Sequence, residues 1–322
     1  MPMPDPPVLL VVGAGASSSW REGLRRLAAL HPLVLLESGP AAWACPYVLD
    51  TVDADLRDGP AVAAAVDAVA ARHFVTGVMT YLEEHAPLAA HLAACRGLPG
   101  LGAPAAAACR DKAVMRSQLA ARDVPQARSY PVPDAPTAVE YARLLGYPVV
   151  LKPRGPSQAL RLRSARTATQ VHDAFRAAQE ASLPRADAVT GVLIEEWIAG
   201  PAVAVECVVR PDGVRLVAVT RNGPAAGGDA TVPVPDVRAT AVRALQALGV
   251  EYGIMRVEMR LTPHGPTVTE IAARPSADFL PVLARLATGA VGADAAGGPA
   301  EGTAARIGRR STPLSAVTGE DR

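Results

Sequence analysis

The sequence predicts two kinds of architecture in one chain, a doubly wound α/β domain followed by an α+β unit. In the first hundred residues, short apolar runs alternate with amphipathic helical stretches, an order typical of a parallel sheet covered by helices. In the second half, apolar strands pair around the turns "PDG" (211–213) and "PHG" (263–265), which favours antiparallel hairpins. We therefore expect a doubly wound N-terminal domain and a mixed C-terminal part.

Apolar periodicity and turn residues place the individual elements. In the first hundred residues the expected strands are 8–12, 32–38 and 76–82, and the expected helices are 20–30 and 60–72. A segment rich in Gly and Pro, 95–104, marks a domain boundary. Beyond it we expect, in chain order, a helix over 105–123, a strand over 147–153, a helix over 168–181, strands over 191–198, 202–209 and 214–220, a helix over 237–249, and strands over 254–262 and 266–274. The residues from 290 onward have no periodicity, so we expect them to be disordered.

The composition disfavours several classes of protein. The 322-residue chain carries 32 basic and 31 acidic residues, and this balance disfavours nucleic acid and anionic membranes as partners. Its four cysteines form no CxxC pair, which disfavours a zinc site or a disulfide framework and favours a reducing compartment. Because no basic residue precedes Arg21 and no run of eighteen apolar residues occurs, we expect neither a signal peptide nor a membrane span. A cytoplasmic protein is expected, and the sequence leaves open whether it is a homo-oligomer.

Two lysines stand out because the chain otherwise uses arginine for positive charge. Of 32 basic residues, only Lys112 and Lys152 are lysine. Lys152 ends the apolar strand "YPVVLKP" and precedes a short turn that contains Gly155 and Ser157. A cation beside exposed backbone amides is typical of a polyphosphate cradle. The alternative is an ordinary solvated lysine, at a strand end for Lys152 and on a helix surface for Lys112.

Two carboxylates lie on adjacent predicted strands, Glu258 in "MRVEMR" and Glu270 in "TEIAARP". Across the hairpin they can face the same side of the sheet, where paired acidic oxygens suit magnesium; the alternative is a solvated sheet face. By the strand period of two, Arg256 and Arg260 share the face of Glu258, and Arg274 follows Glu270 by four residues. Cations beside a carboxylate pair would stabilise a charged intermediate.

The order of these motifs resembles the ATP-grasp superfamily, and more narrowly its carboxylate–amine ligase branch. Between about residues 76 and 289, the segments that carry the resemblance are "MTYLEEHAP", "GLPGLGAP", "CRDKAVMRSQLAARDVP", "GYPVVLKP", "LIEEWIAGP", "VEMRLTPHGPTVTEIAARP" and "LARLATG". The resemblance implies a Rossmann-like N-terminal domain over 1–103, a small central lid domain over 104–196, a C-terminal α+β domain over 197–289 and a disordered tail over 290–322. ATP would lie between the lid and the C-terminal domain.

The resemblance also implies a role for individual residues and a reaction. In the nucleotide site, the residues implied to bind ATP are Lys112, Lys152, Ser157, Glu195, Glu196, Trp197 and Ile198. Glu258 and Glu270 would bind magnesium, with manganese as an alternative. Arg256 would act on the acyl phosphate, and Arg274 would hold a phosphate or a substrate carboxylate. The implied reaction joins a small, amino-acid-like carboxylate to an amine through an acyl phosphate, releasing ADP and phosphate. A compact ammonium reaches a phosphate where a guanidinium fork does not fit, which accounts for the two lysines.

Some positions depart from the family pattern. Ala202 occupies the place where many relatives have an acidic residue that binds ribose, and Ala272 replaces an amide that binds a second metal ion. Losing such interactions costs up to a few kcal/mol each. These departures favour an alternative function, a degenerate ATP-grasp protein that binds nucleotide without turnover and has a binding or regulatory role.

Two further motifs have weaker functional interpretations. The segment "VVGAGASS" (11–18) is similar to a dinucleotide-binding turn, with Glu37 at roughly the ribose-binding distance. Because Ser18 replaces the third glycine, a tight strand-to-helix turn is the favoured interpretation, and an NAD-dependent oxidoreductase is the distant alternative. His85 and His91 lack the i, i+4 spacing of a zinc helix, so we expect surface or packing roles for both.

Overall fold

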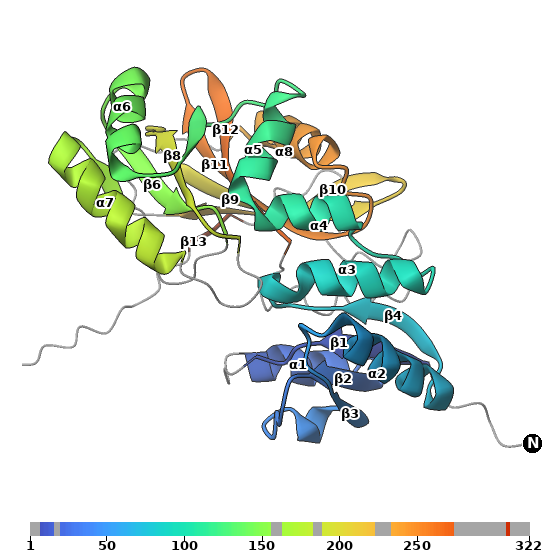
Figure 1. The fold of residues 1–322 in the computed structure, drawn as a ribbon. Helices are drawn as coiled ribbons and strands as arrows, with labels where there is room; N and C mark the ends of the chain where they lie inside the picture. Colours follow the sequence, from blue (N-terminus) through green and yellow to red (C-terminus); the bar gives the residue numbers. More distant parts are fainter. Residues whose placement is uncertain are drawn as a thin grey trace, which may run out of the picture.

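The N-terminal unit is a parallel α/β sandwich. The computed structural model describes residues 7–15, 20–155, 163–182, 189–222, 233–273 and 307–309, and within these ranges the strands form three sheets (Figure 1). The first sheet has the order β3 (Asp50–Asp53), β2 (Leu33–Glu37), β1 (Val8–Val12) and β4 (Val75–Met79), with every pair parallel. The helices of this unit are α1 (Arg21–Ala28), α2 (Gly59–Arg72) and α3 (Ala86–Cys95). Alternate residues of β1 enter two different apolar clusters, because a parallel sheet is buried on both faces. The expected doubly wound domain is confirmed.

The second sheet, called here the lid sheet, is antiparallel. Its order is β5 (Ser129–Val132), β8 (Val192–Glu196), β6 (Val149–Pro153) and β7 (Arg163–Ala165). Helices α6 (Ala135–Leu145) and α7 (Ala168–Ala181) pack against it in one apolar cluster and lie side by side in Figure 1. Each helix begins at a side chain that accepts a hydrogen bond from a backbone N–H of the first turn, Asp134 from Thr137 and Thr167 from Gln170.

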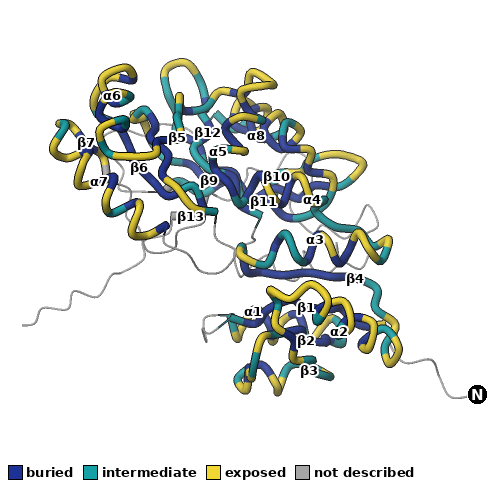
Figure 2. Tube along the Cα trace, in the orientation of Figure 1, coloured by how far each residue is buried: buried dark blue, intermediate teal, exposed yellow. Residues whose placement is uncertain are grey.

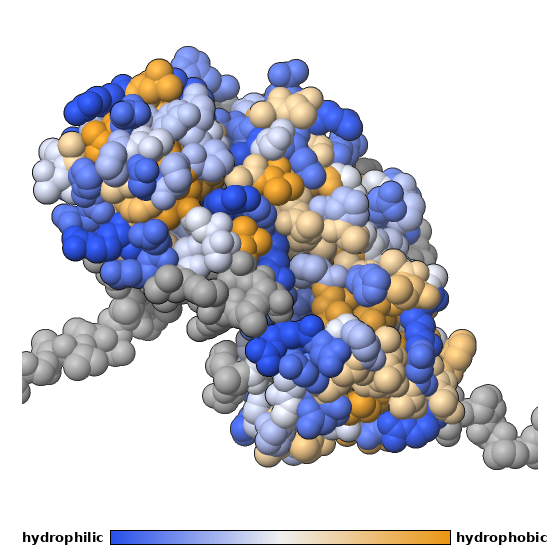
Figure 3. All heavy atoms as spheres, viewed as in Figure 1, coloured by the Kyte–Doolittle hydropathy of each residue, from blue (hydrophilic) through white to orange (hydrophobic). Residues whose placement is uncertain are grey.

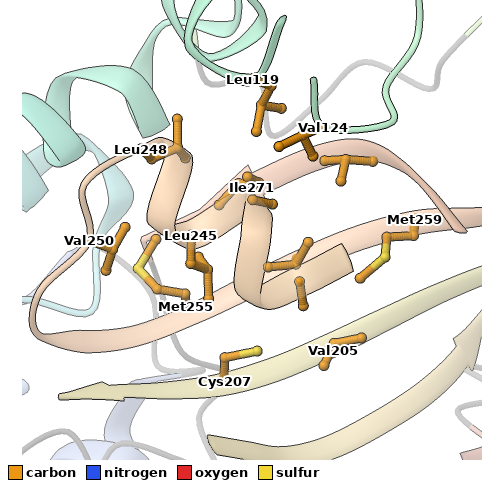
Figure 4. Packing of buried hydrophobic residues seen from close by; sticks show 14 of the residues in the cluster. Leu119, Val124, Val205, Cys207, Leu245, Leu248, Val250, Met255, Met259 and Ile271 are labelled. Carbon is orange, nitrogen blue, oxygen red and sulfur yellow. The ribbon is translucent and has the colours of Figure 1, made fainter. Parts of the chain in front are cut away.

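The third sheet, called here the C-terminal sheet, contains both expected hairpins. Its order is β12 (Gly265–Ala272), β11 (Gly253–Thr262), β9 (Ala202–Arg210), β10 (Gly213–Asn222) and β13 (Ile307–Arg309). One face packs against α8 (Val234–Ala247) and against α4 (Ala103–Arg110) and α5 (Lys112–Ala120). Figure 4 shows this core, with Leu119 and Leu245 facing Met255 and Ile271. The opposite face of β11 carries the half-buried Arg256, Glu258 and Arg260.

Two expected boundaries differ from the packing. Residues 105–123 were expected to form one helix in the central domain, but Asp111 ends α4 and caps α5 by accepting a hydrogen bond from Ala113 N. Both helices bury their apolar residues in the core of the C-terminal sheet rather than in the core of the lid sheet. Within the tail that was expected to be disordered, residues 307–309 are strand β13, which pairs in parallel with β10. All other residues of this tail lie outside the described ranges.

The strands are mostly buried, and the helices expose their outer faces (Figure 2). None of the helices in the described ranges combines the length and the apolar character that crossing a membrane requires.

Candidate functional site

Lys112 lies where three elements meet. Because Asp111 caps α5, Lys112 is the first residue of that helix. Its backbone N–H donates to the carbonyl of Arg154 at 3.0 Å, and its Nζ donates to the carbonyl of Gly155 at 3.1 Å. The same Nζ lies 3.3 Å from Oε1 of Glu270 on β12. Lys112 therefore connects α5, the turn after β6 and the C-terminal sheet.

Lys152 lies on the lid sheet and contacts β12, the strand that Lys112 also contacts. It is buried on β6, and its Nζ lies 2.7 Å from Oε2 of Glu195 on the neighbouring strand β8. Its Nζ also donates to the carbonyl of Thr269 on β12 at 3.4 Å. The alternative of a solvated strand-end lysine does not hold for this side chain, which is only 7% exposed.

Arg116 is a buried member of this group that the sequence analysis did not single out. Its Nε donates to Oε1 of Glu195 at 2.8 Å, while Nη1 and Nη2 donate to the carbonyls of Val268 and Thr269 at 3.1 and 2.7 Å. Arg116 lies four residues after Lys112 on α5, and residues with this spacing share a helix face. That spacing was the available signal.

The five residues form what we call the charge cluster: Lys112, Arg116, Lys152, Glu195 and Glu270. With all five ionised, three cations against two carboxylates leave one excess positive charge. Burial lowers the pKa of Lys152, an effect that Glu195 partly offsets. Burial alone would raise the pKa of Glu195, but Lys152 and Arg116 outweigh it and leave that pKa below its ordinary value. For Glu270 burial is likewise outweighed, by Lys112 and Lys152, so its pKa is also lowered. A buried excess of positive charge suits an anionic ligand.

The two acidic residues of the second hairpin are direct partners. Glu258 pairs with Glu270 in the register of β11 and β12, so both side chains face the same side of the sheet, as expected. Arg256 lies between two carboxylates: Nε is 3.0 Å from Oε1 of Glu258, and Nη1 is 2.8 Å from Oε1 of Glu206 on β9. Burial would lower the pKa of Arg256, but these two carboxylates raise it. Glu206 is buried and was missed by the sequence analysis, since "AVECVV" looks like an ordinary strand.

The end of β8 separates the two adjacent glutamates. Glu195 faces the charge cluster, whereas Glu196 faces away and accepts hydrogen bonds from N and Nε of Arg128 at 2.8 and 2.7 Å, because successive strand residues point to opposite faces. Trp197 is 39% exposed, and the guanidinium of Arg260 lies 5.7 Å from its ring centroid. Ile198 is half-buried in the segment that leads to β9.

Comparison with known proteins agrees with this arrangement. Residues 111–221 match the family model described as "Carbamoyl-phosphate synthase L chain, ATP binding domain". The structure of an L-amino acid ligase from Bacillus licheniformis has a similar fold, with a TM-score of 0.69, 20% identity, and coverage of 88% of this chain and 74% of that one. The ADP complex of PurK, an N5-carboxyaminoimidazole ribonucleotide synthetase, also has a similar fold, with a TM-score of 0.70 and 15% identity. The match covers 89% of this chain and 78% of that one. The chain has the ATP-grasp fold, and residues 111–221 match an ATP-binding domain.

One curated relative has a higher sequence identity than these two structures. "Uncharacterized protein y4rH" of Sinorhizobium fredii (strain NBRC 101917 / NGR234) is 30% identical over 294 residues, which cover 84% of this chain and 58% of that protein. This chain therefore spans little more than half the length of that relative.

Two of the predicted site residues, Ser157 and Arg274, lie outside the described residues. The two departures from the family pattern lie beside arginines. In the strand register, Ala202 pairs with Arg260 and Ala272 pairs with Arg256. In the described part of the chain, no three His, Cys, Asp or Glu side chains gather into a metal cluster.

The "GAGASS" turn is closely packed where it is described. Gly13 has φ +75°, and a Cβ built there would lie 2.3 Å from Cδ2 of His85. Glu37 accepts hydrogen bonds from the backbone N–H groups of Ala14 and Ser38, at 2.5 and 3.0 Å. Gly13 thus permits the approach of a histidine ring, and Glu37 stabilises the turn itself, as the interpretation as a tight turn expects.

Proposed function

We propose that this protein is an ATP-dependent ligase that joins a small carboxylate to an amine. The carboxylate attacks the γ-phosphorus of ATP, the bond from that phosphorus to the ADP oxygen breaks, and an acyl phosphate forms. The amine then attacks the acyl carbon and loses a proton, and inorganic phosphate leaves. The observation that carries the proposal is the charge cluster. It combines two lysines and a buried arginine with two carboxylates, and so has one excess positive charge when all five residues are ionised.

In this proposal Lys112 and Lys152 donate to the phosphates of ATP. An ammonium has three donors, and each lysine contacts one carboxylate and one carbonyl, so both can also donate to a phosphate oxygen. An anion here would offset the desolvation that lowers the pKa of Lys152. We assign Glu195 to holding Lys152 in place, and the backbone of Glu196, Trp197 and Ile198 to the adenine ring. Ser157 would contribute to the phosphate turn.

Glu258 and Glu270 fit a magnesium ion by chemistry and register. Each uses Oε1 to bond a cation, Arg256 and Lys112 respectively, and a carboxylate has two oxygens with about four lone-pair sites. Magnesium commonly binds one or two carboxylates together with substrate phosphates. A bound magnesium ion would neutralise charge on the phosphate oxygens. Manganese prefers similar oxygen ligands and is the alternative.

Arg256 and Arg274 are assigned to the reacting end of the site. Because Glu206 and Glu258 both bond Arg256, the guanidinium is held on the face that carries the two acidic residues. There it would stabilise negative charge on the carboxylate and on the acyl phosphate, without reorganisation during the reaction. Arg274, next in sequence after Ala273, would hold a phosphate or a substrate carboxylate.

A second function, nucleotide binding without turnover, is favoured by one observation. At both positions where the family pattern expects a polar ligand-binding side chain, this chain has alanine, Ala202 and Ala272. An assay of ADP release separates the two functions. Carboxylic acids and amino acids would be tested with hydroxylamine as the amine, because it traps acyl phosphates as hydroxamates. ADP and hydroxamate formed in equal amounts support the ligase; ATP binding without ADP release with any acid supports the second function.

The nucleotide site itself is tested by calorimetry with Mg–ATP. Lys152→Ala should lose most of its affinity, whereas Arg176→Ala should not, because Arg176 is an exposed arginine on α7 that pairs with Asp173. Equal affinities of Lys152→Ala and the wild type for Mg–ATP would contradict the assignment of Lys152 to the phosphates. The double variant Ala202→Glu with Ala272→Asn should bind Mg–ATP more tightly than the wild type, since it restores both missing side chains. Failure of this variant to bind ATP at any magnesium concentration would leave only the fold.

A further inference from the structure

A cavity of about 70 Å³ lies at the junction of the N-terminal unit and the C-terminal sheet. Its walls come from the end of β4, the first half of α3, the segment 99–101 and the start of β11. Among the described residues that line it, none carries a charge, and most are small or aliphatic. Figure 3 shows mainly apolar atoms on the face that α3 and α4 present near this junction. An uncharged cavity of this kind favours an apolar group.

The cavity adjoins the position of Arg256 on the C-terminal sheet. Ile254 lines the cavity and lies two residues before Arg256, which places both on the same face of β11 and roughly 7 Å apart along the strand. Ala273, just beyond the end of β12, and Met255 also line the cavity, and both pack with the core on the other face of this sheet, so the cavity lies at the strand ends. A molecule with an anionic group at Arg256 would reach the cavity by extending along β11 toward Ile254.

The alanines of α3 leave the space open. Ala90 is 3% exposed and lines the cavity, yet it belongs to neither apolar cluster of the N-terminal unit, whereas Ala93 packs into one of them. Ala86 also lines the cavity outside those clusters. A cavity of about 150 Å³ holds benzene, so this smaller cavity suits a short aliphatic group rather than an aromatic ring.

We infer that this cavity binds the side chain of the carboxylate substrate, and that the substrate is an amino acid or related acid with a short aliphatic side chain. The inference rests on the proposed ligase function, because it takes the substrate carboxylate to lie at Arg256. A charged side chain is excluded because it would be desolvated without a partner. A glycine-like acid lacks the group that fills the cavity and binds less well.

The test measures kcat/KM for ADP release with hydroxylamine and each of glycine, L-alanine, L-valine and L-aspartate. The two aliphatic acids should exceed L-aspartate by at least roughly tenfold, since a single methylene in an apolar pocket changes the rate by about 10–200-fold. Ala90→Leu fills the cavity and should lower kcat/KM for L-valine roughly tenfold or more, with little change for glycine. Ala94→Leu, on the exposed side of the same helix, should change neither. If Ala90→Leu does not fold, as judged by ATP binding, Ala86→Val takes its place.

The outcomes separate this inference from the function on which it rests. L-aspartate used as well as L-valine, or Ala90→Leu lowering the rates for glycine and L-valine equally, would overturn the cavity assignment and leave the ligase in place. ATP binding without ADP release from any acid would overturn both.

Discussion

Removing the charge of Glu195 should destabilise the protein far more than removing the charge of the next residue. Glu195 bonds two cations, Lys152 at 2.7 Å and Arg116 at 2.8 Å, and the three side chains are 4–7% exposed. Glu195→Gln keeps the shape but leaves two buried cations without a carboxylate. Breaking a buried ion pair in this way costs about 3–5 kcal/mol, and the low exposure means that solvent screens little of it.

Glu196→Gln is the matched control. Glu196 bonds Arg128, whose side chain is 60% exposed, and exposed pairs contribute about 0–1 kcal/mol. Urea unfolding of the nucleotide-free proteins at pH 7 and one salt concentration measures both changes. The double variant Lys152→Met with Glu195→Gln should recover part of the loss, because it removes one of the two unpaired cations. Equal stability losses for Glu195→Gln and Glu196→Gln would refute the reasoning that the charge cluster depends on Glu195.

Two further predictions concern the backbone and the pH. Gly200→Ala should destabilise the protein by more than the roughly 1–3 kcal/mol of backbone strain alone, because Gly200 has φ +126° and its Cβ would lie 2.0 Å from the carbonyl oxygen of Leu261. Gly213→Ala is the control for backbone strain alone, because Gly213 has φ +138° and no atom lies close to its Cβ position. Urea unfolding compares the stability losses of the two variants. Since the pKa values of Glu195 and Glu270 are lowered from 4.5, their stabilisation should be complete above pH 4.5 and decline as the pH falls through their folded values. A rise in unfolding free energy on acidification from pH 4.5 would contradict this.

The sequence was informative where pattern and packing coincide. The hairpin of Glu258 and Glu270 was predictable because alternate apolar residues fix which face is buried, and with it the register of the acidic pair. Strand β3, "DTVD", was not predicted, since it is a half-exposed edge strand with little apolar content. Helix α6 also escaped, although Asp134 caps it, because its apolar stripe is short and rich in alanine.

The charged residues of the interior were harder to predict for a different reason. Arg116 and Glu206 each look like a solvated residue of an ordinary helix or strand. Their partners lie far away in sequence: Glu195 and Thr269 for Arg116, and Arg256 for Glu206. Local periodicity carries no signal of such contacts, and only the fold brings them together.

The burial of Lys152 implies a conflict between the stability of the nucleotide-free protein and the binding of nucleotide. A lysine whose pKa is lowered by folding destabilises the empty protein while it is protonated, since the unfolded chain holds the proton more readily, and this penalty falls as the pH rises toward the ordinary lysine pKa. Replacing the ammonium with a methionine side chain would remove that penalty and leave Glu195 paired with Arg116. A search for heat-resistant variants without nucleotide should therefore select against Lys152, whereas the same search with saturating nucleotide should retain it. Opposite outcomes at one position would mark the residue whose burial serves the ligand rather than the fold.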